Sequence, residues 1–220
     1  KRLRSTSKAD QLKLDFPDQF QDYFHDGRVV IPIRNANVKR PEVVGFAGRA
    51  LRSVLPEGVA KYLLTPGFEK ASHLYNASAA FAAVADDMKN GKPATLYLVE
   101  GFLDALRLQS LGQRAVALMG VSLGKGQFEL LQKFVDVLPP SPGTLTFSIF
   151  LDNDPAGFAG TNRIVRALLG MVGVDLRWVG LPWRTKPALG KDPDTCLSGI
   201  ASPQDAAAWM QRYDLPAEAM

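Results

Sequence analysis

Short apolar runs alternate with amphipathic stretches over most of this chain. From about residue 74 onward, runs typical of β-strands occur at 95–99, 115–118, 144–151 and 174–179. Patterns with the period of an α-helix occur at 74–89, 103–111, 127–137, 156–169 and 203–213. Repeated strand and helix units of this kind build a parallel sheet with right-handed crossovers and helices on both faces. This region is therefore predicted to be an α/β domain.

The first part of the chain has a different pattern. Residues 28–33 and 42–49 are predicted to be the two strands of a hairpin around a turn at 35–41, and residues 62–64 add a short extended piece. The start of the chain is polar and weakly periodic. We therefore expect four segments: a tether or partial helix at 1–26, a basic antiparallel α+β subdomain at 27–73, the α/β domain at 74–200, and a C-terminal helical segment at 201–220.

Composition places limits on the class of protein. A chain of 220 residues that is 46% hydrophobic can bury a substantial core, and no apolar stretch approaches the length of about 20 residues that spans a bilayer. We therefore expect a soluble protein. The single cysteine, Cys196, excludes a disulfide framework and a Cys-based zinc module within this sequence. Because the first residue is Lys1 rather than methionine, we expect a fragment of a longer protein.

The distribution of charge is more informative than the net charge of +4, which a solvated basic surface explains without any partner. Lysine and arginine are concentrated before residue 75, whereas the notable acidic groups come later. A basic half facing an acidic half suits a polyanion held beside metal ions.

Carboxylates follow two of the predicted strands. Glu100 comes directly after the strand at 95–99, and Asp104 lies one turn into the next helix. Asp152 and Asp154 come at the end of the strand at 144–151. Because neighbouring strand tips of a parallel sheet meet in one crevice, we expect these side chains to converge. Oxygen ligands without a His or Cys cluster favour magnesium or manganese over zinc, and such ions usually support phosphoryl transfer.

Some of these acids also have a purely structural interpretation. Asp104 can simply favour the N-terminus of its helix, and Asp154 before Pro155 can be an ordinary helix cap. Asp192 and Asp194 form an Asp-Pro-Asp sequence in a loop, and for these two alone turn chemistry is the favoured interpretation. The pairing of the Asp-x-Asp sequence with Glu100 at a second strand end is what favours a metal site.

Together these elements resemble the TOPRIM fold, the metal-binding core shared by DnaG-type primases, topoisomerases and some nucleases. The resemblance to the RNA-polymerase domain of DnaG-type primases extends over about residues 28–200. It is carried upstream by residues 28–34, 44–49, 61–66, 68–70 and 74–76, and downstream by residues 99–104, 117–120, 152–154 and 192–195. The acidic signature indicates the superfamily, and the upstream hairpin narrows it to primases.

The resemblance implies a fold and a set of site residues. The fold is a TOPRIM-type, Rossmann-like parallel sheet with helices on both faces, preceded by a small antiparallel α+β subdomain. The implied catalytic and metal-binding acids are Glu100, Asp152 and Asp154, with Asp104, Asp192 and Asp194 completing the metal-binding set. The implied nucleic-acid or nucleotide ligands are Arg34, Arg49, Lys61 and Lys70. Two or more Mg²⁺ or Mn²⁺ ions are the implied cofactors.

The implied activity is template-directed synthesis of short primers on single-stranded DNA from nucleoside triphosphates. A replicative helicase is a further implied partner, through regions outside this sequence, and a membrane is not expected. The implied location is the cytoplasm in bacterial, plasmid or phage replication, with an organelle left open. The nature of the primer, RNA or DNA, and the initiation sequence are not implied.

Several residues depart from the family's pattern, and two other functions stay open. Ala71 and Ser72 stand where the family often has Gly-Arg, so one phosphate-binding charge is missing or supplied elsewhere. Asn153 and Pro155 replace the more usual Gly and an Arg or Lys. One alternative is a TOPRIM nuclease or topoisomerase that cleaves DNA. The other is a non-catalytic module that binds single-stranded DNA or a replication partner.

Overall fold

The chain folds into two compact units. The computed structural model describes residues 24, 27–52, 54–138, 144–181 and 189–220, so the predicted tether at 1–26 lies outside the described residues apart from Phe24. Of these described residues, those up to 33 and those within 43–68 form the first unit, and those within 34–42 and 69–220 form the second. The segment boundaries expected from the sequence, at residues 26, 73 and 200, remain a prediction.

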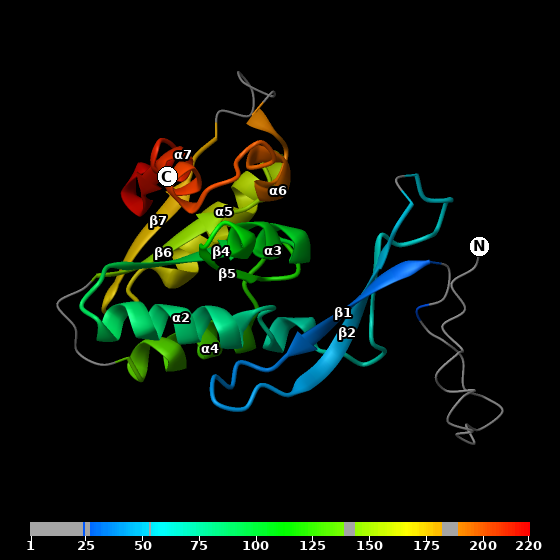
Figure 1. Ribbon diagram of the computed structural model, residues 1–220, viewed down its shortest axis with the longest axis horizontal. Coiled ribbons are helices and arrows are strands. Elements are labelled where there is room, and N and C mark those ends of the chain that lie inside the picture. Colours follow the sequence, from blue (N-terminus) through cyan, green and yellow to red (C-terminus); the bar gives the residue numbers. More distant parts are fainter. Residues whose placement is uncertain (1–23, 25–26, 53, 139–143, 182–188) are drawn as a thin grey trace. The chain divides into compact units, whose positions relative to one another are not determined.

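The first unit is built on a three-stranded sheet. Its strands are β1 (Arg28–Arg34), β2 (Val43–Ala50) and β3 (Tyr62–Leu64), in the order β1-β2-β3, and β3 runs antiparallel to β2. Figure 1 shows β1 and β2 side by side. Ile33 and Ala47 are fully buried, while the valines at the ends of β1 and β2 are exposed. The small antiparallel subdomain predicted from the alternating pattern is therefore present.

The second unit contains a five-stranded sheet in the order β5-β4-β6-β7-β8. Its strands are β4 (Ala94–Val99), β5 (Arg114–Ala117), β6 (Leu145–Phe150), β7 (Val174–Val179) and β8 (Asp214–Pro216). The first four are parallel, and β8 pairs antiparallel with β7 at the edge. The predicted parallel sheet is confirmed, and β8 is an addition that the sequence analysis missed.

Helices cover both faces of this sheet, as predicted. They are α2 (Ala77–Lys89), α3 (Phe102–Ser110), α4 (Lys125–Asp136), α5 (Pro155–Leu168), α6 (Pro193–Cys196) and α7 (Pro203–Gln211), with short 3₁₀ turns η1 (Lys70–Ser72) and η3 (Ala217–Ala219). Figure 1 shows α2 and α4 on one side of the sheet and α7 on the other.

The alternation along β4 explains why both faces are covered. Leu96 and Leu98 belong to a large core formed with α2, α4 and α5. Val99 points to the opposite face and is fully buried there. A strand buried on both faces is typical of a parallel sheet between two helical layers. None of the helices within the described ranges is both long and apolar enough to cross a membrane.

Candidate active site at the carboxyl edge of the parallel sheet

Two acidic segments leave the sheet side by side. β4 and β6 are adjacent and parallel, with Val99 opposite Phe150. Glu100 is the first residue after β4, and Asp152 is the second residue after β6. Both segments therefore emerge from the carboxyl edge of neighbouring strands, which is the juxtaposition expected from the sequence.

The carboxylates are close enough to influence each other. The pKa of Glu100 is raised to about 7, first by burial and then by the negative charges of Asp152 and Asp154. Lys191 and Lys70 oppose this effect. A carboxyl group with this environment is half-buried among like charges, so a cation beside it is electrostatically favoured.

Asp154 combines a structural role with a position at the site. It is the N-cap of α5, and its Oδ1 accepts hydrogen bonds from the backbone amides of Ala156 (3.0 Å) and Gly157 (2.9 Å). These hydrogen bonds lower the pKa of Asp154, and the bond from the Gly157 amide has the largest effect. Its second oxygen, Oδ2, lies 3.5 Å from Lys191 Nζ. The helix-cap interpretation is thus confirmed, and one oxygen of the carboxylate still faces the acidic edge.

Asp104 is turned into the protein rather than outward. Its Oδ2 accepts a hydrogen bond from the Gly101 amide (2.9 Å), and its Oδ1 accepts one from the Asp194 amide (3.2 Å). The residue is 6% exposed, and burial raises its pKa to about 7. Asp104 therefore ties the start of α3 to the start of α6, with both carboxylate oxygens used by backbone amides.

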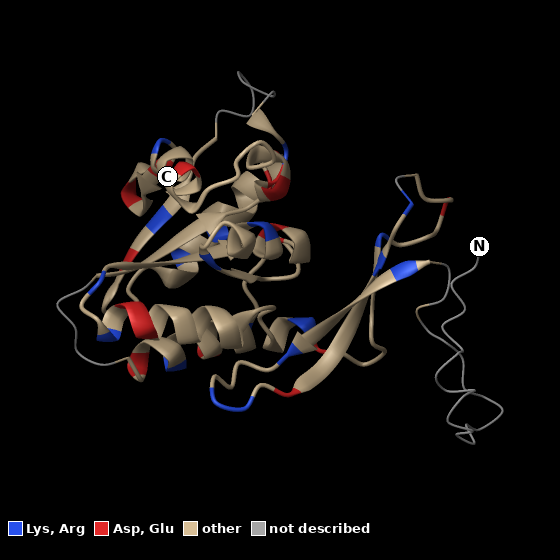
Figure 2. Cartoon of the chain, in the orientation of Figure 1, with Lys and Arg blue, Asp and Glu red and all other residues tan. Residues whose placement is uncertain are grey.

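The third acidic segment, which contains Asp192 and Asp194, lies at the start of α6. Asp192 is the N-cap of α6 and accepts hydrogen bonds from the Thr195 amide (2.8 Å) and hydroxyl (2.7 Å). Its charge raises the pKa of Asp104, and so, to a smaller extent, does that of Asp152. In place of the loop turn predicted from the Asp-Pro-Asp sequence, the structure has a short helix that Asp192 caps, and this cap lies within electrostatic range of the other acids. Figure 2 shows acidic residues at the starts of both α3 and α6.

Lys70, one of the four predicted basic ligands, lies close enough to Glu100 for its positive charge to oppose the rise in the pKa of that carboxyl group. A side chain at Gly120 would begin 3.2 Å from Lys70 Nζ, and the Gly120 amide donates to the carbonyl oxygen of Glu100. Arg34 belongs to the same unit and donates to the carbonyl oxygen of Pro41. Arg49 and Lys61 lie together in the first unit, where the Ala50 amide donates to the Lys61 carbonyl. Their proposed roles remain predictions.

Neither Lys191 nor Gln127 is assigned a site role from the sequence. Lys191 Nζ lies 3.9 Å from an oxygen of Asp152 and 3.5 Å from one of Asp154. Gln127 is 1% exposed, and its side-chain amide donates to the carbonyl of Lys70. Lys191 directly precedes the Asp-Pro-Asp sequence, which was the available signal. Gln127 gave none, because a glutamine within an amphipathic helix has no distinguishing pattern.

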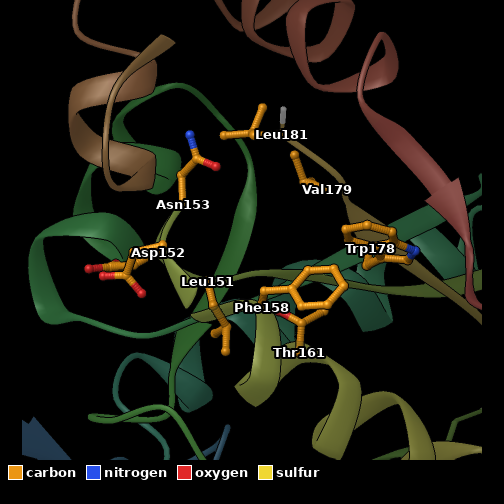
Figure 3. A pocket seen from close by; sticks show the side chains of 9 residues that line it. Leu151, Asp152, Asn153, Phe158, Thr161, Trp178, Val179 and Leu181 are labelled. Atoms are coloured by element: carbon orange, nitrogen blue, oxygen red, sulfur yellow. The ribbon is translucent and has the colours of Figure 1, made fainter. Parts of the chain in front are cut away.

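A shallow pocket adjoins the acidic edge. Asp152 and Asn153 line it together with the apolar side chains of Leu151, Phe158 and Trp178. The rings of Phe158 and Trp178 meet edge to face with centroids 6.1 Å apart. Figure 3 shows the Asp152 carboxylate directed away from these rings. The carboxylate therefore faces the acidic edge rather than the aromatic part of the pocket.

The acids fit a divalent cation in their chemistry. Their donors are carboxylate oxygens, the ligands that Mg²⁺ and Mn²⁺ prefer, and the ammonium of Lys191 already lies between two of them. Within the described ranges, however, no three Asp, Glu, His or Cys side chains are gathered closely enough to hold a metal ion. The donor set is thus present along one edge, but its oxygens do not form a closed coordination shell.

Two protein families match this chain in succession. The family described as "DNA primase catalytic core, N-terminal domain" matches residues 4–81, and the Toprim-like family matches residues 97–197. The second match contains all six predicted acids. The TOPRIM-type fold expected from the sequence is therefore confirmed.

The chain is similar to curated DNA primases and to solved primase structures. It is 34% identical over 188 residues to a DNA primase of Myxococcus xanthus, covering 84% of this chain and 26% of that protein. The zinc-binding and RNA-polymerase domains of the Aquifex aeolicus primase match 96% of this chain and 48% of that chain, with 27% identity and a TM-score of 0.66. A DnaG catalytic domain bound to single-stranded DNA matches 87% of this chain and 53% of that chain, with 28% identity and a TM-score of 0.57. The chain spans about a quarter of the length of the curated relatives it matches.

Proposed function

Because the chain belongs to the DnaG-type primases and carries their catalytic core, we propose that it synthesises short primers on single-stranded DNA in a metal-dependent, template-directed reaction. The observation that carries this proposal is the placement of Glu100 beside Asp152 and Asp154 at the ends of two adjacent parallel strands. A similar catalytic domain has been solved with single-stranded DNA bound, which supports a single-stranded template.

We assign the metal-binding role first to Glu100, Asp152 and Asp154. Bound Mg²⁺ or Mn²⁺ would activate a primer hydroxyl and offset negative charge on the triphosphate and the leaving pyrophosphate. Asp154 is fixed by its cap to α5, so one of its oxygens is held in place at the edge. Asp104 and Asp192 act mainly through the backbone, by holding the starts of α3 and α6. Asp194 contributes its amide to the bond with Asp104.

Basic side chains would bind the polyanionic substrates. Lys70, beside Gly120 and within range of Glu100, is placed to contact a triphosphate held at the acids. Arg34, Arg49 and Lys61 are proposed to contact the template or the nucleotide. Nucleoside triphosphates as substrates, a replicative helicase as partner and the cytoplasm as location belong to the same proposal.

A primer-synthesis assay tests this function. The chain is incubated with single-stranded templates of mixed sequence, labelled ribo- or deoxynucleotides, and Mg²⁺ or Mn²⁺. We expect Asp152→Asn and Glu100→Gln to abolish synthesis while the circular dichroism spectrum is unchanged. Asp136→Asn, at the last residue of α4, is the control and retains activity. Unimpaired synthesis by a folded Asp152→Asn protein would refute the site assignment.

DNA cleavage is the competing activity of the same fold. A plasmid-nicking assay with the same metal ions separates the two activities. Metal-dependent nicking without nucleotide incorporation would favour a nuclease. Binding of single-stranded DNA with neither reaction would favour a non-catalytic module.

A further inference from the structure

Lys191 is the cationic side chain that lies between two of the proposed metal ligands. Its Nζ is 3.9 Å from Oδ2 of Asp152 and 3.5 Å from Oδ2 of Asp154. The second of these is the oxygen that the α5 cap leaves unused, because the cap bonds go to Oδ1. The ammonium therefore contacts the oxygen of Asp154 that would be available to a metal ion.

The backbone of Lys191 is anchored to the acidic turn. The Asn153 amide donates to the Lys191 carbonyl, and the Asn153 side-chain amide donates to the Gly190 carbonyl (3.1 Å). The Lys191 amide itself donates to the Thr195 hydroxyl (3.0 Å). These hydrogen bonds hold the backbone of Lys191 at the site independently of the position of its side chain.

The side chain of Lys191, in contrast, is mostly in solvent. It is 66% exposed, whereas the side chains of Asp152 and Asp154 are 20% and 30% exposed. Both distances are longer than a hydrogen-bonded ion pair of about 2.8 Å. A long, solvated lysine at such distances can leave the pair at little cost, because exposed ion pairs are weak.

We propose that Lys191 is an exchangeable internal counter-ion, which occupies the space between Asp152 and Asp154 in the metal-free protein and is displaced when a divalent cation binds. This inference rests on the proposed function, since it takes these carboxylates as metal ligands. Lys191 offsets their mutual repulsion before the metal arrives, and it lowers the affinity of the site for the metal. It is a positioning residue, because it acts through the ligands.

Metal binding without any reaction tests the inference directly. Mn²⁺ is titrated into the full chain without nucleotide or DNA, and the free ion is measured by electron paramagnetic resonance. Removing one positive charge a few ångströms from a divalent ion at a solvated site should tighten binding about three- to tenfold. We expect this gain for Lys191→Gln at low ionic strength, and a smaller gain in 0.5 M salt. Lys191→Arg, which keeps the charge, should bind Mn²⁺ as the wild type does.

Lys92→Gln is the matched control. Lys92 is an exposed lysine that precedes β4, so it lies at the opposite end of the strand from Glu100. Six strand residues separate the two positions by about 20 Å, which is beyond the Debye length at physiological salt. This variant should bind Mn²⁺ as the wild type does.

The outcomes separate this inference from the proposed function. Tighter binding by Lys191→Gln supports the inference. Equal or weaker binding by Lys191→Gln overturns it and leaves the proposed function intact, provided that Asp152→Asn weakens Mn²⁺ binding. A wild-type chain that does not bind Mn²⁺, or binding that Asp152→Asn does not weaken, overturns both.

Discussion

The side-chain amide nitrogen of Gln127 lies 2.8 Å from the carbonyl oxygen of His73, although 54 residues separate them in sequence. The carbonyl oxygens of Lys70 (3.1 Å) and Leu118 (2.9 Å) also lie within hydrogen-bond distance of this nitrogen, whose two N–H groups are shared among the three acceptors. The Gln127 side-chain oxygen accepts from the Gly124 amide (2.8 Å). One buried side chain thus joins α4, the end of β5 and the turn that carries Lys70. It fixes the backbone from which the Lys70 ammonium extends toward the acids.

Gln127→Ala should destabilise the fold. The substitution removes a hydrogen-bond partner from the buried Leu118 carbonyl and from the partly buried His73 carbonyl and Gly124 amide, which costs about 2–3 kcal/mol of unfolding free energy. Urea denaturation followed by circular dichroism measures this loss. The control is Gln132→Ala on the same helix, whose side chain makes an exposed bond to Asp136 and should change stability by less than about 0.5 kcal/mol. Equal effects of the two substitutions would show that the buried network contributes nothing.

Gly157 gives a second prediction, because it lies against the backbone of Asp152. A Cβ atom at Gly157 would stand 1.9 Å from the Asp152 carbonyl oxygen, so the chain carrying Asp152 would have to move. Gly157→Ala should therefore lose about 2 kcal/mol of stability, although alanine normally favours a helix over glycine. It should also weaken Mn²⁺ binding.

The control for this steric effect is Gly199→Ala. No atom lies within 4 Å of the Cβ that this change would add, and the residue is exposed. Stability and Mn²⁺ binding are measured for both variants by thermal unfolding and ion titration. A Gly157→Ala protein with wild-type stability and Mn²⁺ affinity would contradict the close contact.

The convergence of the acids could be predicted from sequence because it follows from topology. Once β4 and β6 are recognised as parallel strands, their carboxyl ends must lie at one edge, and Glu100 and Asp152 are within two residues of those ends. The helix cap at Asp154 could likewise be predicted, since this acid directly precedes a proline at the start of a predicted helix. The segment after Asp192 was predicted as a loop, so the cap of α6 was missed.

The remaining features depend on tertiary contacts that have no local signal. β8 is three residues long and pairs only because it returns beside β7, where Asp214 is opposite Val179. The inward turn of Asp104 depends on the amide of Asp194, which is 90 residues away in sequence. The positions of Gln127 and Lys191 follow in the same way from packing between distant segments. Periodicity and spacing along the chain do not contain that information.

The raised pKa of Glu100 predicts how the stability of the metal-free protein depends on pH. A carboxyl whose pKa rises from its ordinary value to about 7 on folding binds its proton more tightly in the folded state. Its stabilising contribution is complete below the ordinary pKa and is lost as the pH rises toward and through 7. Burial also raises the pKa of Asp104 to about 7, so this group likewise makes the folded protein less stable as the pH rises. In EDTA, the melting temperature should therefore fall between pH 5 and 8.

Glu100→Gln should remove part of this pH dependence. The variant is expected to be more stable than the wild type at pH 8 by about 1 kcal/mol, after a discount for the partial exposure of Glu100, and the difference should vanish near pH 4.5. Glu129→Gln, a surface change on α4, should follow the wild-type curve. Melting curves in EDTA over this pH range provide the measurement. A wild-type curve that is flat from pH 5 to 8 would be inconsistent with the raised pKa values.

The last prediction concerns Arg107, which links α3, the helix that carries Asp104, to the residues that follow α6. It lies on α3, three residues after Asp104, and its guanidinium donates to the carbonyls of Leu197 and Ile200, which follow α6. Arg107→Ala should cost about 2 kcal/mol of stability, since hydrogen bonds from a charged donor are lost. It should also increase amide hydrogen exchange in residues 192–200, while Arg166→Ala, at an exposed position on α5, changes neither quantity. Unchanged exchange in that segment would mean that packing, rather than Arg107, holds α6 at the acidic edge.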